Sequence, residues 1–143
     1  MPIKTWYVGL DVSAATAMVL LVDGQSQIRC RQRTKLRPQD GHLSCLERLV
    51  GLVDEALGSV SVSRQEVAGA GLGIPGVVDG GRGMVVESIH LGWKELPVQQ
   101  ILGRRLGIPV AIDNDVNLGT YGEFISGAAQ GARNELGIFE RDG

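Results

Sequence analysis

The opening third of the chain alternates apolar and polar residues with the period of β-strands. This pattern predicts three strands, over residues 6–11, 16–23 and 27–34. A small-residue turn, Ser13-Ala14-Ala15, separates the first two strands, and Asp23-Gly24 supplies a tight turn before the third. Short turns between consecutive strands favour antiparallel pairing, so the sequence predicts an antiparallel meander at the start of a sheet.

Downstream of Pro38 the apolar residues recur at helical spacing instead. They predict a helix over residues 41–57, with Asp40 as its N-cap. The rest of the chain alternates between the two periods and predicts strands over 67–74, 84–87, 109–113 and 136–139, and helices over 97–106 and 115–127. A meander followed by alternating helices and strands is typical of an α/β domain with a mixed β-sheet flanked by helices.

Composition and charge narrow the class of protein. The 143 residues are 43% hydrophobic and carry a net charge of −2, whereas a general nucleic-acid binder normally shows a basic face. The one basic cluster, at residues 29–37, fits the solvated side of a strand. No apolar run approaches the roughly 18 residues of a membrane span, and the N-terminus lacks the apolar core of a signal peptide. We therefore expect a cytoplasmic protein with neither nucleic acid nor membrane as partner.

Two further sequence features are weak guides to chemistry. The cysteines, Cys30 and Cys45, fit no metal or redox spacing, so two free thiols are expected. Residues 71–76 match the dinucleotide-binding pattern G-x-G-x-x-G after a predicted strand. That reading requires a helix to begin at the loop, so that its N-terminus meets the pyrophosphate. Here Val77-Val78-Asp79-Gly80-Gly81 follows, which is typical of a strand and a turn, so the dinucleotide interpretation is disfavoured.

Four segments taken together resemble one family. They are the strand that ends at Asp11 and returns through Thr16, then Gly73-Ile74-Pro75-Gly76, then Leu91-Gly92-Trp93, and finally Asp113-Asn114-Asp115-Val116-Asn117. Their order and wording resemble the sugar kinases of the ROK family (repressors, open reading frames and kinases), which belong to the actin-like ATPase superfamily. The resemblance implies an actin-like ATPase (ribonuclease H-like) fold. It makes residues 1–143 a single N-terminal lobe of a glucokinase-like enzyme, with the second lobe absent.

The resemblance makes Asp115 the catalytic base. Phosphoryl transfer to a sugar hydroxyl needs a carboxylate that accepts the hydroxyl proton, and a predicted helix N-terminus favours the ionised form of Asp115. Asn114 then corresponds to a ligand of a sugar hydroxyl, because an amide both donates and accepts hydrogen bonds. The alternative is that Asn114 or Asp115 merely caps the helix.

Other sugar-binding positions follow from the same resemblance. Gly73 and Gly76 correspond to a loop whose backbone approaches the sugar ring, although an ordinary turn would also use these glycines. His90 stands where the family has a sugar-binding asparagine, and a buried histidine with satisfied hydrogen bonds is an equally fair interpretation. Glu123 lies two helical turns beyond Asp115 and shares its face in the predicted helix, or is simply solvated.

The phosphate end of the predicted site departs from the family. Asp11 corresponds to the aspartate that organises Mg²⁺ and phosphate, and Thr16 to the threonine of the same loop. The family pattern D-x-G-G-T is replaced by Asp11-Val12-Ser13-Ala14-Ala15-Thr16, so both glycines are missing and the threonine comes one position late. Because backbone amides that cradle phosphate favour glycine, phosphate binding by this loop is in question.

Three hypotheses remain for the function. The first is the sugar-binding and catalytic-base lobe of an ATP-dependent hexose kinase, with a small-molecule sugar as partner and ATP and Mg²⁺ as cofactors. The second is the sugar-sensing lobe of a ROK transcriptional regulator, and the third is a non-catalytic remnant. The family's histidine–cysteine zinc motif and second glycine-rich phosphate loop have no counterpart in the sequence. We therefore expect the isolated chain to be inactive. Without a second lobe, apolar surface around Leu136, Ile138 and Phe139 should be exposed, so we also expect homo-oligomers.

Overall fold

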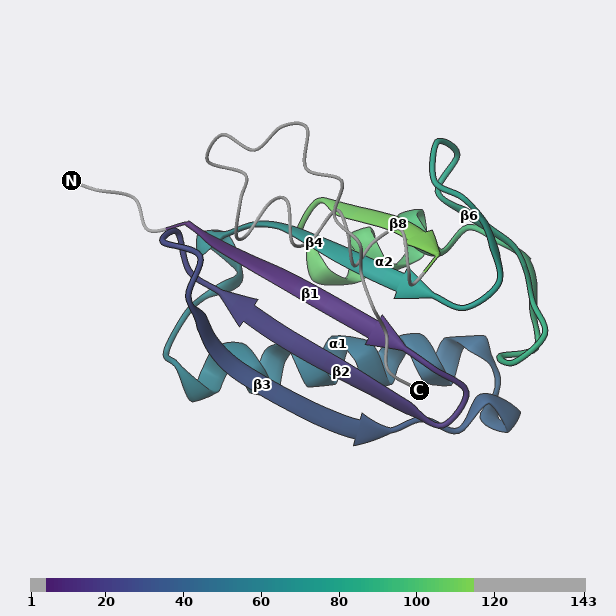
Figure 1. The fold of residues 1–143 in the computed structure, drawn as a ribbon, viewed down its shortest axis with the longest axis horizontal. Coiled ribbons are helices and arrows are strands. Elements are labelled where there is room, and N and C mark those ends of the chain that lie inside the picture. Colours follow the sequence, from purple (N-terminus) through teal and green to yellow (C-terminus); the bar gives the residue numbers. More distant parts are fainter. Residues whose placement is uncertain (1–4, 115–143) are drawn as a thin grey trace.

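The computed structural model describes residues 5–114, which form two β-sheets and two α-helices (Figure 1). The larger sheet has five strands in the order β3-β2-β1-β4-β8. Its strands are β1 (Trp6–Val12), β2 (Thr16–Val22), β3 (Ile28–Lys35), β4 (Val67–Ile74) and β8 (Val110–Asn114). The strand predicted over 136–139 and the helix predicted over 115–127 lie outside the described residues.

The pairing within this sheet is mixed, as the sequence predicts. Strands β1, β2 and β3 form an antiparallel meander, whereas β4 pairs in parallel with β1 on one side and with β8 on the other. After Gly76 the chain continues into a strand, β5 (Val77–Asp79), and no helix begins there. The dinucleotide interpretation of residues 71–76 therefore fails its structural test.

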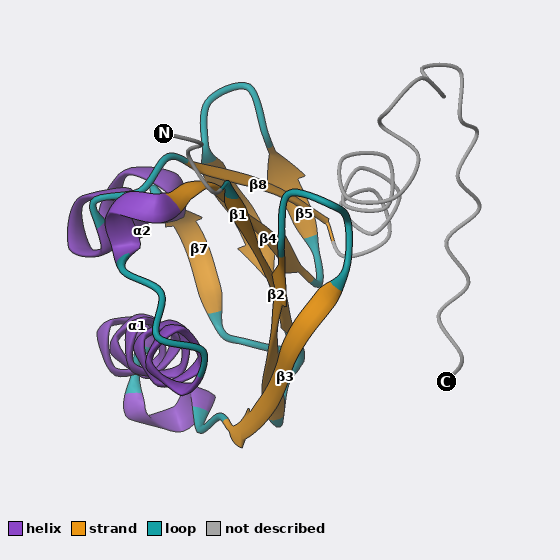
Figure 2. Ribbon diagram, turned by 90° about the vertical axis from the view of Figure 1, so that its left-hand side faces the viewer, coloured by secondary structure: helices purple, strands orange, loops and turns teal. Residues whose placement is uncertain are grey.

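Both helices lie on one side of the larger sheet (Figure 2). Helix α1 (His42–Ser59) and helix α2 (Val98–Leu106) agree with their predicted positions to within two residues. The predicted cap is wrong, because Gly41 holds the N-cap position of α1. Asp40 instead ends a short 3₁₀ helix, η1 (Pro38–Asp40), and its Oδ2 accepts a hydrogen bond of 3.0 Å from Arg37 Nε.

The core fills the space between the helices and the sheet. Alternate residues of β1, including Val8 and Leu10, are buried on the side that faces the helices. They meet the apolar stripe of α1, in which Leu46 and Leu49 are completely buried. Burying a leucine side chain stabilises a fold by about 1.5–3 kcal/mol, so this layer supplies much of the driving force for folding.

One arginine joins three elements on the helical side. The Arg64 guanidinium, in the 3₁₀ helix η2 (Arg64–Glu66), pairs with the Asp54 carboxylate of α1 at 2.8 and 3.0 Å. It also donates to the backbone carbonyls of Arg105 and Leu106 at the end of α2, at 2.9 and 3.1 Å. The Asp54 carboxylate accordingly raises the pKa of Arg64. This clamp fixes how the two helices lie relative to each other.

A smaller sheet lies beyond the end of β4. It consists of β5, β6 (Met84–Ser88) and β7 (Trp93–Leu96), with β6 in the middle. The sequence predicts β6 but not β7, because only the first and last of the four β7 residues are buried and they show no alternation. Trp93 and Leu96 join the main core, so the small sheet is part of the same folded unit.

Among the helices within residues 5–114, none combines the length and the hydrophobicity that a membrane span requires.

Candidate functional site

Three parallel strands of the larger sheet end at the same edge and bring predicted site residues together there. Strands β1, β4 and β8 run in one direction, and their register aligns Asp11 with Gly73 and Gly73 with Asp113. The next aligned pair is Ile74 with Asn114. Ligands of open α/β sheets bind at the carboxyl ends of the strands, so this edge is where a site is expected.

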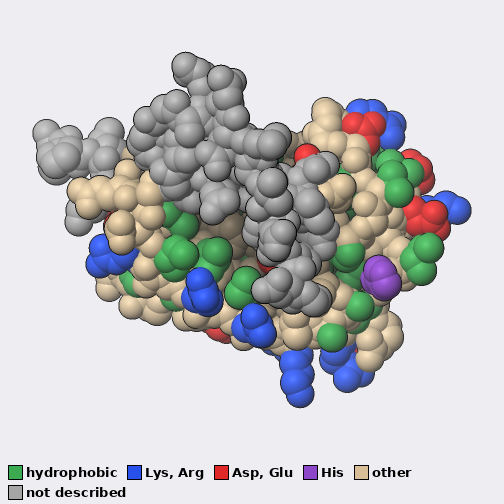
Figure 3. Space-filling view, in the orientation of Figure 1, with side chains coloured by type: hydrophobic (Ala, Val, Ile, Leu, Met, Phe, Trp, Pro, Cys, Tyr) green, Lys and Arg blue, Asp and Glu red, His purple; other side chains and the backbone are tan. Residues whose placement is uncertain are grey.

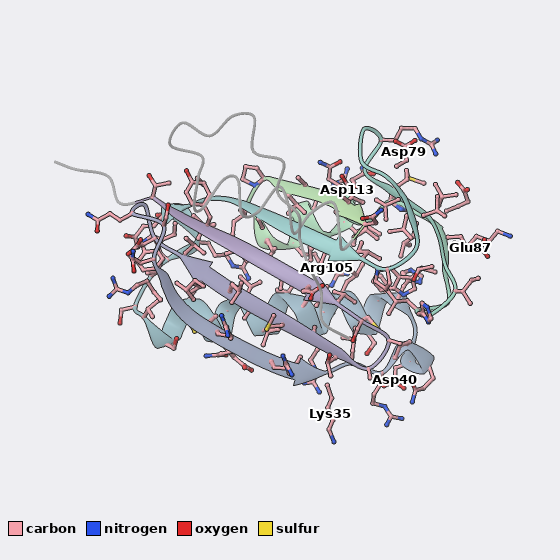
Figure 4. The ribbon with its side chains drawn as sticks, viewed as in Figure 1. Lys35, Asp40, Asp79, Glu87, Arg105 and Asp113 are labelled. Atoms are coloured by element: carbon pink, nitrogen blue, oxygen red, sulfur yellow. The ribbon has the colours of Figure 1, made fainter. Side chains whose placement is uncertain are left out.

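The row formed by Asp11, Gly73 and Asp113 lies on the side of the sheet away from the helices. Asp11 alternates with Leu10 and Val12, which are buried on the helical side, so its side chain belongs to the opposite face. Gly73 carries no side chain between the two aspartates. Two carboxylates therefore lie on either side of Gly73 in this row, and Figure 4 shows Asp113 at the end of β8.

The residues that end β8 are partly buried and locally ordered. Asn114 donates its backbone N–H to Asp113 Oδ1 at 2.8 Å. Both residues are half-buried at the sheet edge. Asp115, the predicted base, follows Asn114 directly in the sequence, but Asp115 and Glu123 both lie outside the described residues.

Thr16 begins β2 at this same edge, immediately after the turn that joins β1 to β2. The Ser13 hydroxyl lies inside this turn, 3.0 Å from Thr16 Oγ1, and accepts hydrogen bonds from the backbone amides of Ala15 and Thr16 at 3.4 and 3.2 Å. The hydroxyl of Ser13 thus closes the turn that the family resemblance associates with phosphate.

Gly76 connects the larger sheet to the smaller one, and its backbone requires glycine. Its φ is +127°, and a Cβ placed there would collide with the carbonyl oxygen of Glu87 and lie 2.9 Å from Ser88 Cα. The glycine therefore lets the turn after β4 pack directly on β6. This packing explains Gly76 without a sugar.

His90 is exposed in the turn between β6 and β7, so the alternative of a buried histidine is wrong. The turn is closed by the Gly92 N–H, which donates to the Ser88 carbonyl at 2.8 Å. Figure 4 shows Glu87, on the strand that leads into this turn, well to the right of Asp113. No described contact joins His90 to the edge that holds Asp11, Gly73 and Asn114.

Basic side chains gather along one border of the face away from the helices. Figure 3 shows a row of Lys and Arg side chains near its lower edge, where Figure 1 places β3. The residues are Arg29, Arg31, Arg33 and Lys35, exposed at alternate positions of that edge strand. Arg29 pairs with Asp23, while Arg33 Nη2 lies 3.7 Å from Met18 Sδ. Within residues 5–114, no group of three or more potential metal ligands occurs.

The sequence alone does not show the importance of two residues near the carboxyl edge of the strands, Asp113 and Ser13. Asp113 belongs to the segment 113–117 that carries the resemblance but has no role assigned in it, and only the β4–β8 register shows it in the same row as Asp11. Ser13 was noted as a missing glycine, but its hydrogen bonds cannot be deduced from that substitution. A serine where a family uses glycine beside a threonine is the signal that could have prompted the question.

The similarity to known proteins covers nearly the whole chain. A model of the ROK family matches residues 7–139. A glucokinase of Halalkalibacterium halodurans is 30% identical over 131 residues, which are 92% of this chain and 40% of that enzyme. A putative xylose repressor of a Caldicellulosiruptor species is 27% identical over 81% of this chain and 29% of the repressor.

Solved structures agree with this assignment. The crystal structure of a ROK family glucokinase from Streptomyces griseus, in complex with glucose and AMPPNP, superposes with a TM-score of 0.71 at 25% identity. The alignment covers 88% of this chain and 38% of that enzyme. The chain thus spans 40% or less of the length of each of these three relatives.

Proposed function

The chain belongs to the ROK family, and we propose that it is the sugar-binding and catalytic-base lobe of an ATP-dependent hexose kinase. The observation that carries the proposal is the meeting of Asp11, Gly73 and Asn114 at the carboxyl edge of three parallel strands. In the proposal the sugar lies against Asn114 and the phosphate end of the donor lies nearer Asp11. The kinase relatives and a structural neighbour with bound glucose and AMPPNP support it.

In the proposed reaction Asp115 accepts the proton of the attacking sugar hydroxyl. Its neighbour Asn114 ends β8, a strand held in the sheet by its parallel pairing with β4. In the proposal this base, which directly follows the strand end in the sequence, holds the hydroxyl in line with the transferred phosphoryl group, because positioning supplies most of the catalysis in such reactions. Gly73 leaves room beside Asp11 for the reacting groups.

The acidic row fits a magnesium ion that arrives with the donor. Mg²⁺ is usually held by one or two carboxylates together with substrate phosphates. Asp11 and Asp113, separated by Gly73 in the register, offer those carboxylates on one face. When bound, the ion neutralises the charge of the phosphates. Asp11 would orient it, and Thr16 lies at the same edge.

A sugar-sensing regulator is the second candidate, because xylose repressors are among the relatives and the Ser13 hydroxyl closes the turn near Asp11. Such a protein would bind sugar through the same edge without transferring phosphate. His90, exposed in the turn after β6, and Gly76, whose close packing sets where that turn lies, are proposed to shape the sugar side in both cases. Self-association of the chain stays a prediction.

Replacing Asp115 by asparagine tests the proposal in the full-length protein. We expect Asp115→Asn to lower kcat for hexose phosphorylation by about 10²–10⁴, because proton acceptance is lost while hydrogen bonding to sugar is kept. The measurements are a coupled kinase assay with ATP and Mg²⁺ across several hexoses, and sugar affinity by calorimetry. Asp40→Asn is the matched control, since Asp40 is exposed and paired with Arg37.

Normal turnover in Asp115→Asn would show that Asp115 only caps a helix. Sugar binding by the unaltered protein without turnover in the presence of ATP would favour the regulator instead. Loss of sugar affinity together with activity would mean that Asp115 binds the ground state and is not specifically a base.

A further inference from the structure

In the turn between β1 and β2, two backbone amides converge on one hydroxyl oxygen. The N–H groups of Ala15 and Thr16 donate to the Ser13 hydroxyl oxygen, at 3.4 and 3.2 Å. The same hydroxyl lies 3.2 Å from the Thr16 carbonyl oxygen, to which it donates, and 3.0 Å from the Thr16 hydroxyl, where either group can donate. Consecutive backbone amides that converge in a turn form the kind of concavity that binds an oxygen of an anion. In this chain a neutral hydroxyl of the same turn occupies that position.

The turn at the other end of β2 shows how a charged oxygen closes such a concavity. There Asp23 Oδ1 accepts the amides of Gln25 and Gln27, both at 2.9 Å, and these bonds lower the pKa of the Asp23 carboxyl. Bonds to an ionised acceptor are shorter and stronger than bonds to a neutral one. The two amides of the Ser13 turn, at 3.2 and 3.4 Å from a neutral oxygen, are therefore bonded less strongly than those of the Asp23 turn.

Backbone hydrogen bonds hold the shape of the Ser13 turn in addition to those of its hydroxyl. The backbone N–H of Ser13 donates to the Thr16 carbonyl at 2.8 Å, and the Leu36 N–H donates to the Ala15 carbonyl at 2.8 Å. Residues 13–15 are exposed. Removing the hydroxyl should therefore leave the amides in place and open to solvent.

A positive charge stands close to this turn. Lys35 pairs with Thr16 in the β2–β3 ladder, and among the described residues it forms no ion pair. Figure 4 shows its side chain projecting beyond the end of β3, so it does not fill the turn. A flexible ammonium in this place attracts an anion without competing for the amides.

We propose that the Ser13 hydroxyl competes with phosphate for the amides of the β1–β2 turn, and so sets how tightly this lobe holds a phosphoryl donor. The turn accepts a phosphate oxygen when the Ser13 side chain rotates away from Ala15 and Thr16. The geometry alone shows that the Ser13 hydroxyl occupies the amides of this turn. That this occupancy weakens the binding of a phosphoryl donor rests on the proposed kinase function.

Pyrophosphate binding to the 143-residue chain tests the inference, with Ser13→Ala as the decisive variant. We expect the variant to bind inorganic pyrophosphate about tenfold more tightly in calorimetry at low salt, since the freed amides gain charge-assisted bonds. Ser13→Thr is the matched control, because it keeps the hydroxyl and should match the unaltered chain. Ser13→Gly, which also removes the Cβ, should gain at least as much as Ser13→Ala.

Equal pyrophosphate affinity in Ser13→Ala and the unaltered chain would overturn the inference. A gain in Ser13→Thr as large as in Ser13→Ala would overturn it as well, because the hydroxyl would then be irrelevant. Circular dichroism checks that each variant is folded. If Ser13→Gly is not folded, the comparison of Ser13→Ala with the unaltered chain decides the test. Glucose affinity, measured on the same samples, separates this inference from the proposed function. If the chain binds glucose but Ser13→Ala binds pyrophosphate no more tightly, the proposed function is kept and the inference about Ser13 is wrong. If Ser13→Ala binds pyrophosphate more tightly but the chain does not bind glucose, the inference about Ser13 is kept and the proposed function is contradicted.

Discussion

The two faces of the larger sheet are built from different kinds of residue. On the helical side, Val19, Leu21 and Leu72 are completely buried against α1 and α2. On the opposite side, the aligned positions of β1 and β4 are Gly9 with Gly71 and Asp11 with Gly73. The apolar face can hold the fold together by itself, which leaves the other face free to carry small residues and carboxylates. Stability and chemistry are thus assigned to opposite sides of the same strands.

Truncating a core side chain of β1 should have the largest effect on stability. Leu10 is 3% exposed and faces the helices, so Leu10→Ala leaves a cavity that the packed layer cannot fill. We expect the free energy of unfolding to fall by about 2–5 kcal/mol, measured by urea denaturation. A loss of less than 1 kcal/mol would show that the helical layer does not dominate the stability.

The neighbouring residue gives the matched control for this experiment. Gly9 lies on the other face, and among residues 5–114 the nearest atom to a Cβ added there would be Leu20 Cβ, at 4.0 Å. Gly9→Ala should therefore change the free energy of unfolding little, or raise it by about 0.5–1 kcal/mol, because alanine loses less backbone entropy in a strand. Two adjacent substitutions of opposite sign would establish the difference between the faces most directly.

The junction between the two sheets, at Gly76, should be as tightly packed as the core. Gly76→Ala adds a Cβ against the backbone of Glu87 and Ser88 at a φ of +127°, and should cost about 2–4 kcal/mol of unfolding free energy. Gly92 has a φ of +72°, and no atom of the described part of the chain lies within 4 Å of an added Cβ, so Gly92→Ala should cost only about 1 kcal/mol. Equal costs would mean that the β5–β6 junction yields to the extra atom.

Sequence periodicity predicts the larger sheet well, because its strands alternate and its helices carry continuous apolar stripes. It fails at β7, whose buried Trp93 and Leu96 frame two exposed residues without alternation. It also misplaces the start of α1, since Asp40 pairs with Arg37 and leaves the cap to Gly41. These outcomes depend on contacts with neighbours that no local pattern contains.

The candidate site divides in the same way. The resemblance identifies Asp11, Gly73 and Asn114, and the order of parallel strands then brings them to one edge. It does not reveal that Asp113 shares the row of Asp11, because strand register is a tertiary property. Nor does it show that Ser13 turns inward, since a side-chain rotamer in a turn depends on the amides around it. The resemblance puts His90 at a sugar-binding position, but it does not show that the turn after β6 leaves this side chain exposed.

The smallest predicted effect concerns the exclusion of charge from the helical face. Cys45, on α1, is 2% exposed, and burial, together with the nearby Asp40 carboxylate, raises the pKa of its thiol. Above about pH 8.5 the thiol ionises in the unfolded chain while the folded chain keeps its proton, so unfolding becomes easier as pH rises. One such group contributes at most about 1.4 kcal/mol per pH unit. The free energy of unfolding, measured by urea denaturation between pH 7 and 10, should therefore fall less steeply with pH in Cys45→Ala than in the unaltered chain.

Cys30→Ala is the matched control. Cys30 is half-buried at the sheet edge, so this variant should keep the part of the decline that comes from Cys45. Parallel curves for Cys45→Ala and the unaltered chain would mean that this face admits a thiolate.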